Sequence, residues 1–144
     1  ANDKSEKASL EKNLDKLFFI DKNNLKNFDI SIKKLDSLNF FNKNSKVDFL
    51  KIDVEGHEYE VLQGAKSFIE FNLPKFIQIE INWHQLFKKN NLFEFSVILK
   101  DYDTFKILPF GKNLIQIDPI RPENNIFHLS NFVFIRKDLT NKYK

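Results

Sequence analysis

The sequence contains no cysteine and no methionine, and it has only three glycines in 144 residues. Without cysteine the chain cannot use disulfide bonds, thiolate metal sites or a cysteine nucleophile. The glycines, Gly56, Gly64 and Gly111, are widely separated. These residues therefore include no glycine-rich loop of the kind that cradles a phosphate or a dinucleotide.

Long hydrophobic runs are also absent. No apolar stretch approaches the roughly 20 residues that a membrane-spanning helix needs, and the first residues are polar, unlike those of a signal peptide. The expectation is a cytoplasmic protein without a membrane span.

Neither basic nor acidic residues are in large excess. The chain has 23 Lys and Arg against 20 Asp and Glu, with a net charge of +3 and with both signs interspersed. Nucleic-acid-binding proteins gather basic residues on one face, so no nucleic-acid partner is expected. The hydrophobic content of 42% suits one globular domain over residues 1–144, in which 1–27 form an irregular polar connection.

Hydrophobic periodicity predicts two neighbouring strands joined by a helix. The nearly continuous apolar run at 47–54 is typical of a parallel strand covered on both faces, and 76–81 is a second such run. Between them, 58–69 carries apolar residues at helical spacing. The strand–helix–strand unit should place the two strands side by side and parallel.

The remaining patterns predict shorter elements. Alternation at 28–33 favours a strand, and a short helical turn should follow it. Beyond the central unit, the expected elements are a helix at 92–100 and strands at 102–108, 114–117 and 131–137. Prolines and Gly111 separate the last strands, which indicates a hairpin-like antiparallel end to an α/β fold.

Polar residues gather where the two central strands end. Asp53, Glu55 and His57 follow the first strand, and a second set follows the other: Glu80, Asn82, Trp83 and His84. Ligands of open α/β sheets bind at the carboxyl ends of the strands, so both sets are candidate site residues. Acids before a helix can also cap it, which is the alternative for Asp53 and Glu55 and the only role expected of Glu58 and Glu60.

The stretch KIDVEGHEYEVLQGA, from Lys51 to Ala65, resembles the signature of the FkbM-type S-adenosylmethionine-dependent methyltransferases. The segments at 74–82 and 131–135 look like later strands of the same family. The resemblance implies a Rossmann-like methyltransferase sheet that ends in an antiparallel hairpin. It also implies methylation with S-adenosyl-L-methionine as donor, commonly on a hydroxyl of a sugar or another secondary metabolite.

The resemblance places Asp53 close to the methyl donor, with Glu55 as a second donor-binding residue. A hydroxyl acceptor must lose its proton, and the candidate bases are Asp53, His57 and His84. Glu80, Asn82 and Trp83 are the candidate acceptor-binding residues, although Trp83 and His84 could instead simply cover the sheet edge. Asp53, Glu80 and Asn82 could also ligate Mg²⁺, but no metal is expected.

The missing glycine-rich turn limits what this stretch of chain can do. Complete enzymes of this type begin with a strand, a glycine-rich turn and a helix, which the resemblance does not find here. We therefore expect the C-terminal portion of such an enzyme, incomplete and inactive without an N-terminal segment. The alternative is a non-catalytic Rossmann-like interaction domain. Gly56 is expected to serve backbone geometry, and Gly64 close packing.

Overall fold

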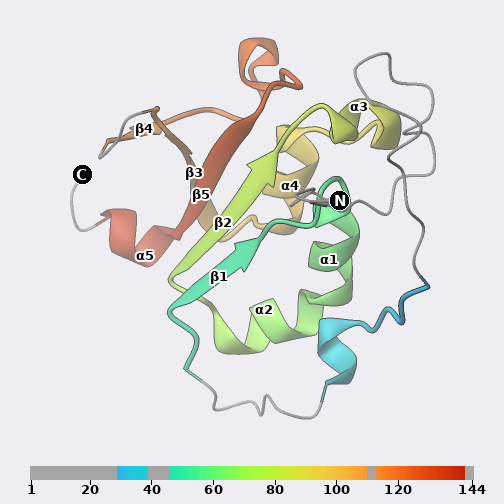
Figure 1. Cartoon of the computed structure of the whole chain (residues 1–144). Helices are drawn as coiled ribbons and strands as arrows, with labels where there is room; N and C mark the ends of the chain where they lie inside the picture. Colours follow the sequence, from blue (N-terminus) through green and yellow to red (C-terminus); the bar gives the residue numbers. More distant parts are fainter. Residues whose placement is uncertain (1–28, 39–45, 110–112, 142–144) are drawn as a thin grey trace, which may run out of the picture.

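The computed structural model describes residues 29–38, 46–109 and 113–141 (Figure 1). They form a mixed α/β structure around one five-stranded sheet with the strand order β1-β2-β5-β3-β4. The strands are β1 (Phe49–Ile52), β2 (Phe76–Ile81), β3 (Tyr102–Ile107), β4 (Leu114–Gln116) and β5 (Ser130–Arg136).

The helices are short. They are η3 (Leu35–Ser37), α1 (Glu58–Gly64), α2 (Lys66–Asn72), α3 (His84–Lys88), α4 (Leu92–Ile98), η4 (Pro122–Asn124) and α5 (Lys137–Thr140). The helix α4 begins at a capping box, in which the Asn91 side chain accepts from the amide of Glu94 and the Glu94 carboxylate accepts from the amide of Asn91. The sequence did not predict α3 or α5.

The predicted central unit is confirmed. β1 and β2 are parallel neighbours, with Phe49 opposite Phe76 and Ile52 opposite Ile79, and α1 and α2 lie between them in the chain. β1 is shorter than the predicted run at 47–54, whereas β2 covers the predicted residues 76–81. The carboxyl ends of both strands therefore lie at one edge of the sheet.

The C-terminal strands pair antiparallel, but their order differs from a simple hairpin end. β5 pairs antiparallel with both β2 and β3, so the last strand lies inside the sheet. Among the described strands, β4 pairs with β3 alone and forms one edge of the sheet. A central position suits β5 because its residues Phe132, Val133 and Phe134 are all buried, which an edge strand would not achieve as well.

The predicted helix at 58–69 is two helices. α1 ends at Gly64, Ala65 lies outside helical geometry (φ −117°, ψ 12°), and α2 begins at Lys66. The Asp36 carboxylate accepts hydrogen bonds from the amides of Ser67 (3.0 Å) and Phe68 (2.8 Å). An acid from another segment thus caps the start of α2, which a pattern of apolar spacing cannot reveal.

The strand predicted at 28–33 is wrong for its described residues, 29–33, which have no regular structure. Ile30 and Ile32 are 62% and 71% exposed. The segment leads into η3, which packs against α1 and α2. Phe28, the connection predicted at 1–27 and Gly111 lie outside the described residues.

The helices α1, α2 and α4 contribute to a core on one face of the sheet (Figure 1). The buried strand residues of this core include Ile52, Ile77 and Ile79. Alternate residues point to the opposite face, where Phe49 is 52% exposed and Phe76 is 36% exposed. Within the described part of the chain, no helix is both long and apolar enough to cross a membrane.

Candidate functional site

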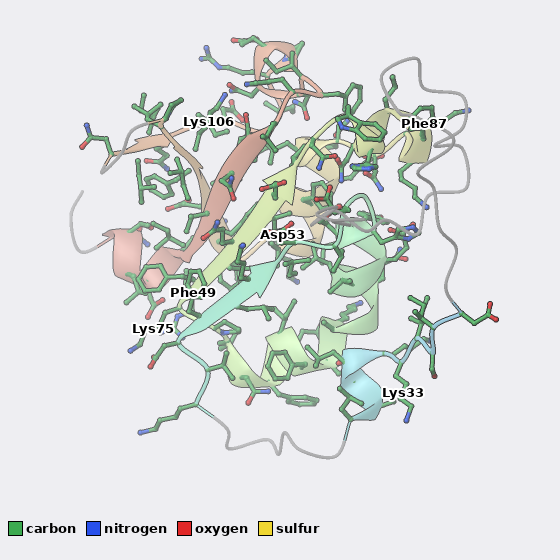
Figure 2. All side chains as sticks on the ribbon, viewed as in Figure 1. Lys33, Phe49, Asp53, Lys75, Phe87 and Lys106 are labelled. Atoms are coloured by element: carbon green, nitrogen blue, oxygen red, sulfur yellow. The ribbon has the colours of Figure 1, made fainter. Side chains whose placement is uncertain are left out.

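Three carboxylates meet at the edge of the sheet where β1 and β2 end. Single carboxylate oxygens of Asp53, Glu55 and Glu80 all lie within 4.8 Å of one another. Figure 2 shows Asp53 at the end of β1, next to β2. The acidic group is defined here as these three residues, and the two strand ends expected from the sequence bring it together.

The turn that follows β1 has an unusual backbone. Glu55 has φ 52° and Gly56 has φ 109°, both in the region that glycine tolerates best. A Cβ on Gly56 would lie 2.6 Å from the Cβ of His84. Gly56 therefore serves both backbone conformation and close approach, in agreement with its predicted role.

The side chain of Glu58 holds this turn. It is fully buried, and its Oε1 accepts hydrogen bonds from the amides of Val54 and Gly56, both at 3.1 Å. Its Oε2 accepts from the side-chain Nε2 of Gln85 at 2.6 Å. The sequence indicated only a helix cap for Glu58, so this wider role was missed.

Asn82 connects the second strand end to the acidic group. It is buried, and its Nδ2 donates to Glu55 Oε2 at 3.3 Å. Its Oδ1 accepts from the amide of His84 at 2.9 Å, and its own amide donates to Gln85 Oε1 at 3.0 Å. Asn82 thus orients Glu55. The sequence suggested Asn82 as the third oxygen ligand beside Asp53 and Glu80, but in the structure Glu55 is in that position.

His84 belongs to the wall of the site. Its ring is buried and stacks on Trp83 with centroids 3.6 Å apart and planes inclined by 28°. Its Nδ1 lies 3.6 Å from Glu55 Oε2 and also contacts Asn82 Oδ1. Trp83 itself is partly buried. Both candidates from the sequence therefore lie beside the acidic group.

His57 faces a different set of partners. It is the N-cap residue of α1, but its side chain makes no capping bond. Its Nδ1 lies 3.5 Å from Lys88 Nζ and 3.8 Å from Glu60 Oε1. Its Nε2 is buried without a described hydrogen bond. These contacts direct His57 toward α3 and not toward the three carboxylates.

Repulsion among the carboxylates is visible at Glu80. Burial, and then the charges of Asp53 and Glu55, raise the pKa of the Glu80 carboxyl above its usual value. Asn131 Nδ2 lies 3.5 Å from Glu80 Oε2 as a weak donor. Asp53 is 33% exposed and forms an ion pair with Lys51 at 2.8 Å, and this contact raises the pKa of Lys51. Lys51 and Asn131 are further members of the site that the sequence did not indicate.

The chemistry of the acidic group suits positively charged or hydrogen-bond-donating ligands. Closely spaced carboxylates repel one another in their charged form, and a bound cation or several N–H and O–H donors would offset this repulsion. Oxygen ligands at this spacing also match what a hard metal ion prefers, although acidic groups of this kind are common without one.

Two cavities lie away from the acidic group. One, of about 650 Å³, is lined by residues that include Phe76, Phe105 and Ile135, at the opposite end of β2 from Glu80. The other, of about 360 Å³, lies beside β3 and is lined by residues that include Lys100 and Asp118. Neither cavity includes a site residue predicted from the sequence.

Comparison with known proteins gives one result. The chain matches the family described as the methyltransferase FkbM domain over residues 2–107, which includes both strand ends and the whole acidic group. No curated protein and no solved structure shows a significant match. The matched residues are well over half of the chain, and the chain therefore belongs to the FkbM methyltransferase domain family.

Proposed function

We propose that the chain is the part of an S-adenosylmethionine-dependent methyltransferase that carries the carboxyl ends of two central strands of a Rossmann-like sheet. The acceptor is proposed to be a hydroxyl of a sugar or another secondary metabolite. One observation carries the proposal: Asp53, Glu55 and Glu80 converge at the ends of two parallel strands inside the matched family region. Ligands of open α/β sheets bind at this position.

The carboxylates of the acidic group fit the proposed ligand. S-adenosylmethionine supplies, when bound, a methyl group on a positively charged sulfonium, and it carries amino and hydroxyl groups as hydrogen-bond donors. Asp53 and Glu55 can accept such bonds and complement positive charge. The raised pKa of Glu80, caused by burial and by these two neighbours, indicates an excess of negative charge that a cation would offset.

The chain must also handle one proton. In the proposed reaction the acceptor oxygen bonds to the methyl carbon, the carbon–sulfur bond breaks with its electron pair left on sulfur, and the hydroxyl proton passes to a base. Asp53 and Glu80 offer carboxylates at the strand ends, and the raised pKa of Glu80, caused by burial and by its acidic neighbours, favours uptake of a proton there. His84 lies against Glu55 and Asn82, so we assign it an orienting role.

Acceptor binding is assigned to the residues around Glu80. Trp83 offers a partly buried aromatic surface, and Asn131 and Gln78 are joined by a hydrogen bond of 2.8 Å on the face that carries Glu80. Aromatic and amide side chains commonly bind the faces and hydroxyls of small polar molecules. His57 stays a candidate base only if a ligand reaches its buried Nε2.

A non-catalytic interaction domain is the second candidate. The sheet face that carries Phe49 and Phe76, which are exposed in the described part of the chain, favours it, because exposed apolar surface often marks contact with another polypeptide. The same surface is expected if a further segment of the enzyme completes the donor site, as the missing glycine-rich turn suggests.

The experiment uses the longest natural form of the protein that contains these residues. It is incubated with methyl-labelled S-adenosylmethionine and a panel of hydroxylated acceptors, and products are detected by mass spectrometry. We expect one methyl group to be transferred to oxygen, together with micromolar donor binding by calorimetry. If neither the donor nor its demethylated product binds, the proposal is wrong and the interaction domain is preferred.

A further inference from the structure

We propose that Glu58 and Gln85 form a buried positioning pair that fixes the turn after β1 against the turn after β2 and so brings the acidic group together. Its consequence for catalysis rests on the function proposed above. The geometric part does not depend on that function, because it concerns only contacts within this chain.

Glu58 anchors the first turn. Both of its carboxylate oxygens accept from the amide of Gly56 at 3.1 Å, and Oε1 also accepts from the amide of Val54 at 3.1 Å. These amides flank Glu55, whose backbone is in the left-handed region. A non-glycine residue keeps such a conformation only where surrounding contacts enforce it. The direction of the Glu55 carboxylate therefore depends on Glu58.

Gln85 anchors the second turn and joins it to the first. Its Nε2 donates to Glu58 Oε2 at 2.6 Å, and its Oε1 accepts from the amide of Asn82 at 3.0 Å. Both Glu58 and Gln85 are completely buried. A continuous series of hydrogen bonds thus runs from the turn after β1, through α1 and α3, to the residue that directly follows β2.

Other contacts between the two turns depend on the turns being held this close together. Asn82 Nδ2 donates to Glu55 Oε2 at 3.3 Å, and the backbone of Gly56 lies close against His84. A helix cap would account only for bonds within the first turn. The bond from Gln85 connects two elements that are 27 residues apart in the sequence, and it has no role in capping α1.

Exchanging the two side chains tests the pair. In Glu58→Gln the side-chain oxygen can still accept from the amides, but its new NH₂ group faces the NH₂ group of Gln85. In the double variant Glu58→Gln, Gln85→Glu, residue 58 can donate to the carboxylate at 85, which can still accept from Asn82. Glu70→Gln is the control, because Glu70 is exposed and its ion pair among the described residues is a 4.0 Å contact with Lys66.

We expect Glu58→Gln to lower methyl transfer at least tenfold through kcat more than through KM. The double variant should recover most of this loss, and Glu70→Gln should match the wild type. Recovery of methyl transfer in the double variant would show that residues 58 and 85 act as a pair. A general loss of stability would not be reversed by a second substitution in the core.

A second readout needs no activity. Carbon-13 NMR titration of the Glu80 carboxyl in the 144-residue chain should show a smaller rise of its pKa in Glu58→Gln, because burial, the largest cause, stays while Asp53 and Glu55 are no longer held beside it. The exchange variant should restore the shift. If wild type and variants titrate in this way but the longest natural form transfers no methyl group, the proposed function is contradicted and the positioning pair stays supported.

The opposite results would overturn the inference. A folded Glu58→Gln variant with wild-type titration of Glu80, wild-type amide shifts at Val54 and Gly56, and unchanged turnover would exclude a positioning role. If Glu58→Gln does not fold, Gln85→Met decides, because it removes the two bonds of Gln85 and leaves those from Glu58 to the first turn in place. An unchanged Glu80 titration in folded Gln85→Met would overturn the proposal, and a smaller rise of the Glu80 pKa would support it.

Discussion

At the scale of single residues, a substitution of Asp53 distinguishes a catalytic role of this residue from helix capping. His57 and not Asp53 is the N-cap residue of α1, and the Asp53 carboxylate instead pairs with Lys51 at the open sheet edge. We expect Asp53→Asn to lower methyl transfer by about 10²-fold, the usual scale for an acid–base group, with little change in the melting temperature. Steady-state kinetics and thermal unfolding of the purified variant measure the two effects.

Asp48→Asn provides the matched control for this substitution. Asp48 also forms an exposed ion pair with a lysine, Lys75 at 2.7 Å, but at the other end of β1 and away from the acidic group. Its replacement should leave turnover unchanged. Equal turnover for Asp53→Asn, Asp48→Asn and the wild type would remove Asp53 from the site.

Glu80 gives a prediction about pH. Its pKa is raised in the folded chain, first by burial and then by Asp53 and Glu55, so the folded state holds its proton to higher pH than the unfolded state. The free energy of unfolding therefore falls as pH rises from the unfolded value of about 4.3 through the raised folded value, and the loss persists at higher pH. Glu80→Gln should raise the melting temperature at pH 7, and this gain should shrink at pH 4.

Thermal unfolding of Glu80→Gln and of the exposed control Glu70→Gln at both pH values provides the measurement. The control should change little at either pH, because Glu70 is exposed and its 4.0 Å ion pair with Lys66 is weak. A Glu80→Gln variant less stable than the wild type at pH 7 would mean that its hydrogen bonds outweigh the repulsion from its acidic neighbours.

At the scale of elements, the turn after β1 and the helix that follows each contain a glycine, and replacing the two by alanine should have opposite effects on stability. Gly56 has φ 109°, and an added Cβ would lie 2.6 Å from the Cβ of His84. Gly56→Ala should cost about 1–3 kcal/mol from backbone strain alone. The close packing predicted for Gly64 is wrong, because an added Cβ would lie 3.5 Å from Lys34, an ordinary van der Waals distance. Gly64→Ala should be neutral or gain up to about 1 kcal/mol.

Chemical denaturation of both variants tests this contrast. Gly56→Ala should also weaken donor binding, because His84 and the turn must separate, whereas Gly64→Ala should bind as the wild type does. Similar stabilities for the two variants would show that the turn relaxes more easily than its contacts suggest.

Elements with strong local patterns could be predicted from the sequence, and those set by distant contacts could not. The run at 76–81 became β2 as predicted, because its isoleucines pack into the core at strand spacing. The predicted covering on both faces is wrong, since Phe49 and Phe76 on the other face are exposed. The break at Ala65 depends on Asp36, which caps α2 from another part of the chain. The same limit applies to the site: the strand ends were predictable, but the bond between Glu58 and Gln85 was not.

At the scale of the whole molecule, the order of the strands determines what the sheet exposes. The sequence indicated antiparallel C-terminal strands but not the insertion of β5 between β2 and β3, because register and strand order depend on long-range packing. In the described residues, the core lies on the face covered by α1, α2 and α4. The other face leaves Phe49 and Phe76 exposed beside β1, an edge strand of the sheet.

This arrangement leads to a prediction about donor binding by these 144 residues alone. The acidic group supplies hydrogen-bond acceptors for one side of S-adenosylmethionine, but the sequence has only three glycines, none near another, and so no glycine-rich turn to approach the rest of the donor. We expect calorimetry to show binding that is weak or absent. Micromolar binding by the isolated chain would show instead that the acidic group and its neighbouring side chains form a sufficient donor site, and the proposed need for a further segment would be wrong.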